Sequence, residues 1–216
     1  MKKMYLKLLL CASILVLTGC VGIGGETIAL SHEALNTPTQ KINKKLTIEK
    51  TATDLRDDKG RIGRATFTVF AITTGSVTTT SPVTEQMVEQ IADALSSLGY
   101  QINKNTNIPG NTSTTAQPLT LKVALNEIWF KNYNWLFPFV PTWGDIKITL
   151  YLENASGNKL FEKSYEGSGN SYCLSGNCAF KNATKEAMTN VLNLVISDFS
   201  SPVVDNLIAA DNKPEK

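Results

Sequence analysis

Few side chains in this sequence could take part in chemistry, and cysteine shows the clearest pattern among them. The chain of 216 residues has four cysteines and one histidine. His32 lies in a polar segment near the amino terminus, so a Ser-His-Asp or Cys-His arrangement would have no base within a folded domain. Zinc sites lack ligands for the same reason. We therefore expect no metal site and no cofactor, and we expect that the protein is not an enzyme.

Cys20 has the most specific surroundings of the four cysteines. A basic start, residues 1–7, precedes an apolar run over 8–17, which is typical of a secretion signal. The run is shorter than the ~20 apolar residues that span a bilayer. It ends in Leu17-Thr18-Gly19-Cys20, which resembles the lipobox of bacterial lipoproteins. We predict that residues 1–19 are a signal peptide and that Cys20 is diacylated. The alternative is an ordinary signal peptide or a buried apolar segment.

The lipobox resemblance also implies a location. Val21, rather than an aspartate, follows the cysteine, and by resemblance to lipoprotein sorting in Gram-negative bacteria this favours the outer membrane, with the domain facing the periplasm. Several acyl chains hold a protein firmly where one chain binds marginally. Three lysines leave with the signal, so 18 basic residues stand against 19 acidic ones, a net charge of about −1. A nucleic-acid partner is therefore not expected.

Cys173 and Cys178 remain in the mature domain, separated by Leu-Ser-Gly-Asn. In an oxidising compartment such a pair can form a disulfide, and the Ser-Gly-Asn sequence allows the turn that it needs. The alternative is a redox pair or half of a metal site. The spacing differs from Cys-x-x-Cys and no second pair of ligands exists, so we favour the structural disulfide.

Asp54 and Arg56 are two residues apart, which places them on the same face of a strand. We interpret them as a structural ion pair in preference to a ligand site. With Gly63 and a later amphipathic helix that ends in Gly99-Tyr100, this Asp-x-Arg motif is similar to the YajG-like lipoproteins. The resemblance covers most of the mature chain. It implies no activity, because that family has no settled one.

An aromatic segment from Trp129 to Trp143 contains all three tryptophans of the protein. Pro138 and Pro141 interrupt it, which excludes a regular central strand or helix. Tryptophan and tyrosine favour surfaces with one apolar and one wet side, so one interpretation is an exposed tip that contacts the membrane or a protein partner. The alternative is a lid on the core. The candidate contact residues are Trp129, Trp135, Phe137, Phe139 and Trp143.

The elements that must position these residues follow from periodicity. Residues 20–45 read as the lipidated cysteine and a flexible tether, with a short strand over 27–30 as an alternative for part of it, 46–210 as a single domain and 211–216 as a disordered tail. Within the domain, the pattern predicts strands at 46–56, 64–73, 100–103 and 119–129, a hairpin of 146–152 with 159–167, and helices at 81–99, capped by Ser81, and 180–199.

This order predicts an α+β fold, in which two amphipathic helices pack on one face of a mostly antiparallel sheet. We expect an outer-membrane-anchored periplasmic lipoprotein, a non-catalytic module that binds a protein partner in cell-envelope assembly or maintenance. The main alternative is a lipid-binding or lipid-transport accessory, which would hold an acyl chain in an apolar cavity between sheet and helices. An enzyme that acts on envelope polymers is a third possibility.

Overall fold

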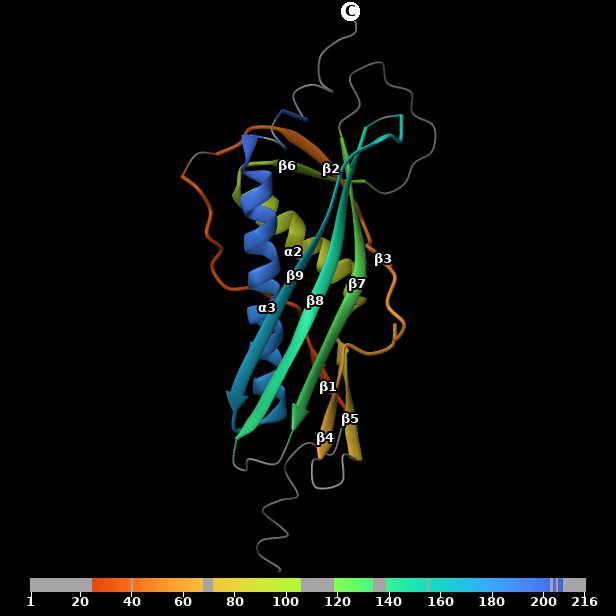
Figure 1. Ribbon diagram of the computed structural model, residues 1–216, viewed down its shortest axis with the longest axis vertical. Helices are drawn as coiled ribbons and strands as arrows, with labels where there is room; N and C mark the ends of the chain where they lie inside the picture. The colour runs from red at the N-terminus through yellow and green to blue at the C-terminus, as the bar shows by residue number, and fades with distance from the viewer. Residues whose placement is uncertain are drawn as a thin grey trace, which may run out of the picture.

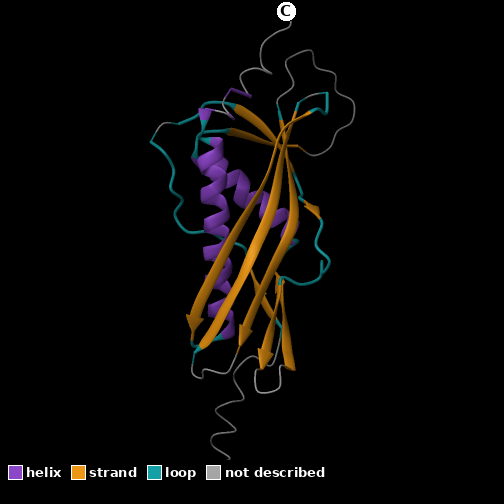
Figure 2. Cartoon of the chain, in the orientation of Figure 1, coloured by secondary structure: helices purple, strands orange, loops and turns teal. Residues whose placement is uncertain are grey.

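The fold is known from a computed structural model, which describes residues 25–39, 41–67, 72–105, 119–133, 139–154, 156–202, 204 and 206–207. Within these ranges the chain forms two helices and one sheet of nine strands (Figures 1 and 2). In chain order the elements are β1 (Glu26–Ile28), β2 (Lys45–Glu49), β3 (Thr53–Asp54), β4 (Gly63–Phe67), β5 (Ile72–Thr79), α2 (Val83–Ser97), β6 (Gln101–Asn105), β7 (Thr120–Tyr133), β8 (Val140–Glu153), β9 (Lys159–Cys173) and α3 (Gly176–Phe199).

Three long antiparallel strands, β7, β8 and β9, form one side of the sheet, with β9 at its edge. Shorter strands pair in parallel with the other edge of β7: β2 near its start, β3 in the middle and β4 near its end. Beyond β4, the strand β5 is antiparallel and β1 pairs with it in parallel. The α+β class and the mostly antiparallel sheet are confirmed, although the parallel pairs make the sheet mixed.

The two helices bury their apolar stripes against this sheet and against each other. α3 lies along β9 and β8, while α2 contacts β2, β6, β7 and α3. Met87, Ile91 and Leu95 of α2 are fully buried, as the predicted helical spacing requires. Gly167 and Gly169 of β9 lie directly beneath α3, where an added Cβ would overlap helix atoms. The placement of both helices on one face stays a prediction.

The predicted strand over 46–56 is interrupted. β2 ends at Glu49, and the short β3 begins at Thr53. Between them the buried Ala52 donates its backbone N–H to Thr84 O of α2, at 3.2 Å, instead of pairing within the sheet. A tertiary hydrogen bond of this kind leaves no local signal in the sequence.

The predicted strand over 64–73 is instead two strands, β4 and β5, which form an antiparallel pair with Phe67 opposite Ile72. Residues 68–71 lie outside the described part of the chain. The apolar run Val69-Phe70-Ala71-Ile72 contains no glycine, proline or asparagine, so it carried no turn signal.

The aromatic segment is more regular than predicted, because β7 continues to Tyr133 and β8 already begins at Val140. Pro141 therefore lies within a strand. It is tolerated there because it is the second residue of β8 and precedes Thr142, the first residue of β8 that pairs with β7. β9 likewise extends past Gly167 to Cys173.

The predicted flexible tether is ordered from Glu26 onwards. β1 overlaps the alternative short strand over 27–30 and joins the sheet, and Ile28 and Leu30 are buried in the core. Leu30 N–H donates to Gln86 Oε1 of α2 at 2.7 Å, and Glu33 N–H donates to Thr189 Oγ1 of α3 at 2.9 Å. The folded unit thus begins near residue 26 and not at 46; the signal, Cys20 and the tail 211–216 lie outside the described residues.

Helix ends follow the sequence in part. Gly99 terminates α2 with a φ of 95°, as predicted. Pro82, and not Ser81, is the N-cap, and no side chain caps this end. α3 begins at Gly176, four residues before the predicted start, because Ser175 supplies the cap by accepting a hydrogen bond from Cys178 N–H.

Candidate functional site

Asp54 and Arg56 form an ion pair, but through a turn and not through a shared strand face. β3 ends at Asp54, and Arg56 N–H donates back to Asp54 Oδ1 at 3.2 Å. The guanidinium then donates from Nε to Oδ1 at 2.9 Å and from Nη2 to Oδ2 at 2.8 Å. Such a bidentate pair fixes both side chains. The pKa of Asp54 is held below its usual value, chiefly by the hydrogen bond from Arg56.

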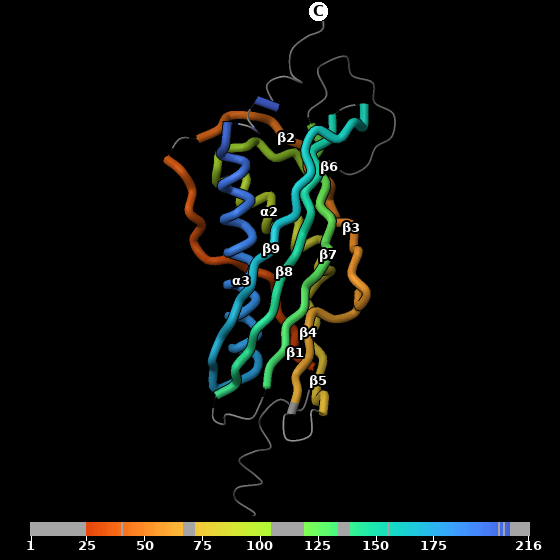
Figure 3. Tube along the Cα trace, viewed as in Figure 1, coloured from red at the N-terminus to blue at the C-terminus, as the bar shows by residue number. Residues whose placement is uncertain are grey.

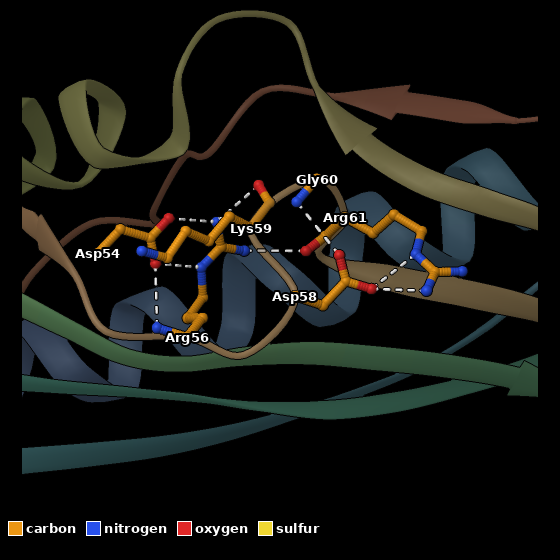
Figure 4. A network of polar contacts seen from close by, with 6 residues as sticks. All are labelled: Asp54, Arg56, Asp58, Lys59, Gly60 and Arg61. Carbon is orange, nitrogen blue, oxygen red and sulfur yellow. Dashed lines mark hydrogen bonds and ion pairs between the residues drawn. The ribbon is translucent and has the colours of Figure 1, made fainter.

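The remaining donors of Arg56 close the loop between β3 and β4 (Figure 4). Nη1 donates to the Arg61 carbonyl at 2.9 Å, and Nη2 also donates to the Lys59 carbonyl at 3.1 Å. The side chain is only 4% exposed. Arg56 is therefore a structural clamp, because four of its five side-chain N–H groups donate within the protein.

A second, exposed ion pair lies in the same loop. Arg61 Nε donates to Asp58 Oδ2 at 2.7 Å, and Asp58 Oδ1 accepts from Gly60 N–H at 3.2 Å. The hydrogen bond from Arg61 is the main reason that the pKa of Asp58 lies below its usual value. The Arg61 guanidinium also lies 5.9 Å from the ring centre of Trp129, within cation–π range.

A pocket of about 300 Å³ opens next to this loop. It lies at the register shift in β7 between Leu125 and Glu127, and we call it the bulge pocket. Bulges often redirect side chains beside functional sites. Its lining is carboxylates, one guanidinium, one amide and two apolar side chains: Arg56, Asp57, Asp58, Asn126, Glu127, Ile128 and Trp129. This mixture suits binding through a polar rim and an apolar floor.

Phe139, Trp143 and Tyr172 are the exposed aromatic residues of the described chain, and they lie where β7 and β9 finish and β8 begins. Figure 1 shows this end of the three strands. Tyr133 and Trp143 stack there, with ring centres 4.9 Å apart and planes at 16°. Phe139 and Trp143 are about half exposed, at 52% and 45%. We call this region the apolar end; its exposed members are Ile72, Phe139, Trp143, Tyr172 and Leu174.

The predicted contact residues are thus divided between two places. Trp129 lines the bulge pocket, whereas Phe139 and Trp143 belong to the apolar end. Trp135 and Phe137 lie outside the described residues.

The sequence did not single out several residues of these sites, among them Arg61, Ile72, Tyr172 and Leu174. Along β9, the buried residues Tyr165, Gly167 and Gly169 alternate with exposed neighbours. This alternation places Tyr172 on the exposed face and was the signal for it. Glycine, serine and asparagine are poor strand formers, and they concealed that alternation. Arg61 carried no signal, because its contact with Trp129 joins residues 68 positions apart.

Cys173 and Cys178 form a disulfide between the end of β9 and the first turn of α3, with Cα atoms 5.9 Å apart. Cys173 packs with Val140 and Ala179 in a small buried cluster. The disulfide therefore fixes the chain around Leu174, which is 69% exposed. The disulfide thus joins β9 to α3 beside the apolar end.

Reduction of this disulfide should lower the free energy of unfolding by about 2 kcal/mol, because the closed loop is short. A reducing agent should shift the urea midpoint of the wild-type chain to lower concentration. The Cys173→Ser/Cys178→Ser chain is the control, and its midpoint should be the same with and without reductant. An unchanged wild-type midpoint would show that the disulfide adds no stability.

In the described part of the chain, no group of three or more His, Cys, Asp or Glu residues is placed to hold a metal ion. None of the helices in the same ranges is long and apolar enough to cross a membrane.

Comparisons with known proteins identify a fold and not a family. No family model and no curated protein matches the chain. Its structure is similar to that of protein XCC0632 from Xanthomonas campestris, of family DUF330, with a TM-score of 0.50 and 10% identity over 84% of this chain and 96% of the other. At that identity the likeness shows the fold alone.

Two further solved structures are similar at lower scores. A candidate lipoprotein from Caulobacter crescentus CB15 has a TM-score of 0.31 and 13% identity, over 56% of this chain and 80% of that one. A minor lipoprotein from Acinetobacter baumannii has a TM-score of 0.34 and 12% identity, over 82% and 98%. The YajG-like resemblance stays a prediction.

Proposed function

We propose that this chain is an outer-membrane lipoprotein, held through lipid on Cys20, whose periplasmic α+β domain is a non-catalytic module that binds a protein partner in envelope assembly or maintenance. The lipobox supports the anchor. The partner-binding role rests on one observation, the Arg61–Trp129 pair beside the bulge pocket.

This pair has the properties of an interface hot spot. Tryptophan and arginine are the residue types enriched at such spots. The Arg61 side chain is 47% exposed, and the Asp58 carboxylate already holds it in place. A side chain that is ordered before binding loses little entropy on association. The clamped loop and the bulge of β7 therefore present a rigid, mixed polar and apolar surface.

A lipid-carrying function would need an apolar cavity between helix and sheet. Gly167 and Gly169 of β9 instead let α3 approach closely. A Cβ at position 167 would lie 2.5 Å from the backbone O of Ala187, and a Cβ at position 169 would lie 2.6 Å from its backbone N. This packing favours the partner-binding role over a lipid carrier.

Photo-crosslinking in intact cells tests the proposal. A photoreactive aromatic residue at position 129 should give a discrete crosslinked protein band, and Arg61→Ala should weaken that band severalfold, as expected for a hot-spot contact. Position 151 is the matched control. Tyr151 also makes a cation–π contact, with Lys159 Nζ 4.4 Å from its ring centre, but it lies near the other end of β8, away from Trp129. Equal products from both positions, or none from 129, would contradict the proposed surface.

A further inference from the structure

We propose that the apolar end rests on the bilayer that holds the lipid anchor, so that Trp143, Tyr172 and Leu174 contact the membrane interface. This inference rests on the proposed lipidation of Cys20 and adds the orientation of the domain. It follows from where the described chain begins, from how far the linker reaches and from what that end exposes.

The amino-terminal strand places the start of the domain near the apolar end (Figure 3). The strand register runs across the sheet from Glu26 of β1 to Val77 of β5, then to Gly63 of β4 and Phe130 of β7. Glu26 is therefore level with Phe130. Phe130 is only three residues before the end of β7. Glu26 Oε2 also accepts a hydrogen bond from Asn177 Nδ2, at 3.0 Å, in the first turn of α3. The chain thus enters the fold beside the disulfide.

The distance from Cys20 to the domain is short. Gly25 is five residues after Cys20, and five residues span at most about 18 Å. β8 alone, with 14 residues, extends over about 46 Å. The linker therefore cannot reach around the molecule, and the entry end of the domain must lie near the membrane surface.

The side chains at this end suit a membrane interface. Trp143 and Tyr172 are exposed on strands, and Tyr133 stacks on Trp143. Tryptophan and tyrosine are enriched at the level of lipid headgroups, because their rings are apolar on the body and polar at the tip. Leu174 is exposed beside the disulfide, which limits its movement. The end is thus rigid and apolar where it meets the bilayer.

Quenching by brominated lipids tests this orientation. The full chain is purified from membranes and reconstituted into phosphatidylethanolamine and phosphatidylglycerol vesicles with or without bromine near the headgroup end of the acyl chains. In the Trp129→Phe/Trp135→Phe chain, the single indole at 143 should lose about half of its emission in the brominated vesicles, as expected at the interface.

The control chain carries Trp143→Phe and Tyr151→Trp in addition to Trp129→Phe and Trp135→Phe, so its single indole is at position 151. Positions 143 and 151 both belong to β8 and are eight residues apart, which is about 26 Å along the strand, so the indole at 151 should not be quenched. Should a multiple variant not fold, the wild-type chain and its Trp143→Phe variant give the same comparison, and most of the quenching should then be lost in the variant.

Mass spectrometry of the same purified chain separates the two proposals. An amino-terminal Cys20 without acyl chains would overturn the anchor and with it the docking. An acylated Cys20 with an unquenched indole at 143, or with equal quenching at 143 and 151, would overturn the docking alone.

Discussion

Replacing Arg56 with alanine should lower the free energy of unfolding by about 3 kcal/mol, which places it among the largest single effects in this protein. The variant leaves the carboxylate of Asp54 and the carbonyls of Lys59 and Arg61 without their donor. Unpaired buried groups cost more than the pair contributes. Asp54 is 17% exposed, so water relieves part of the cost. Urea unfolding at neutral pH measures the change.

Arg61→Ala is the matched control, because it removes an arginine from an exposed pair in the same loop. Its partner Asp58 is 33% exposed, so the expected loss is a small fraction of that for Arg56→Ala. Arg56→Lys should fall between the two, because an ammonium group cannot donate in the bidentate geometry. Equal losses for Arg56→Ala and Arg61→Ala would contradict the clamp.

The same pair predicts an acid dependence. The pKa of Asp54 is lowered in the folded state, chiefly by its hydrogen bond from Arg56. The stability that this carboxylate contributes is therefore fully present above the ordinary aspartate pKa of about 4 and is lost as the pH falls through the lowered value. Urea midpoints at pH 7 and pH 3 should differ less in Arg56→Ala than in the wild type.

Replacing Gly169 with alanine should also destabilise the fold by about 3 kcal/mol, by overpacking. An added Cβ would overlap the carbonyl oxygen of Ala183 and lie 2.6 Å from the backbone N of Ala187. These are backbone atoms of α3, so relief requires the helix to move away from β9 as a unit. Urea unfolding monitored by circular dichroism measures the loss.

Gly60→Ala is the control for the glycine substitution, since its Cβ would meet nothing nearer than Asp58 Oδ1 at 3.7 Å. Its effect should stay within about 0.5 kcal/mol. A Gly169→Ala chain as stable as Gly60→Ala would mean that α3 is free to shift on the sheet.

Prediction from the sequence worked best where one local period determines the element. The stripe of Met87, Ile91 and Leu95 defined α2, and the turn around Gly157, with a φ of 78°, joined β8 to β9. Boundaries failed where a distant contact decides them. The amino-terminal segment looked like a tether because only a few of its side chains are apolar, and two of these, Ile28 and Leu30, are buried in the core.

The candidate sites show the same division. The Asp-x-Arg spacing identified a pair, but the strand ends between the two residues and Arg56 serves as a loop clamp. The aromatic segment was recognised by composition, yet the sequence could not separate Trp129 at the bulge pocket from Trp143 at the apolar end. That separation depends on the continuation of β7 and β8 into the segment.

By itself, the sequence determined the α+β class, the two amphipathic helices and the cysteine pair, because period and short spacing are properties of adjacent residues. It also supplied the lipobox-like sequence Leu17-Thr18-Gly19-Cys20, on which the proposed anchor rests. Only the tertiary structure decided that β1 enters the fold beside Asn177 and that Arg61 lies over Trp129. Those contacts join residues 151 and 68 positions apart, and only the pairing of strands and the packing of α3 bring them together.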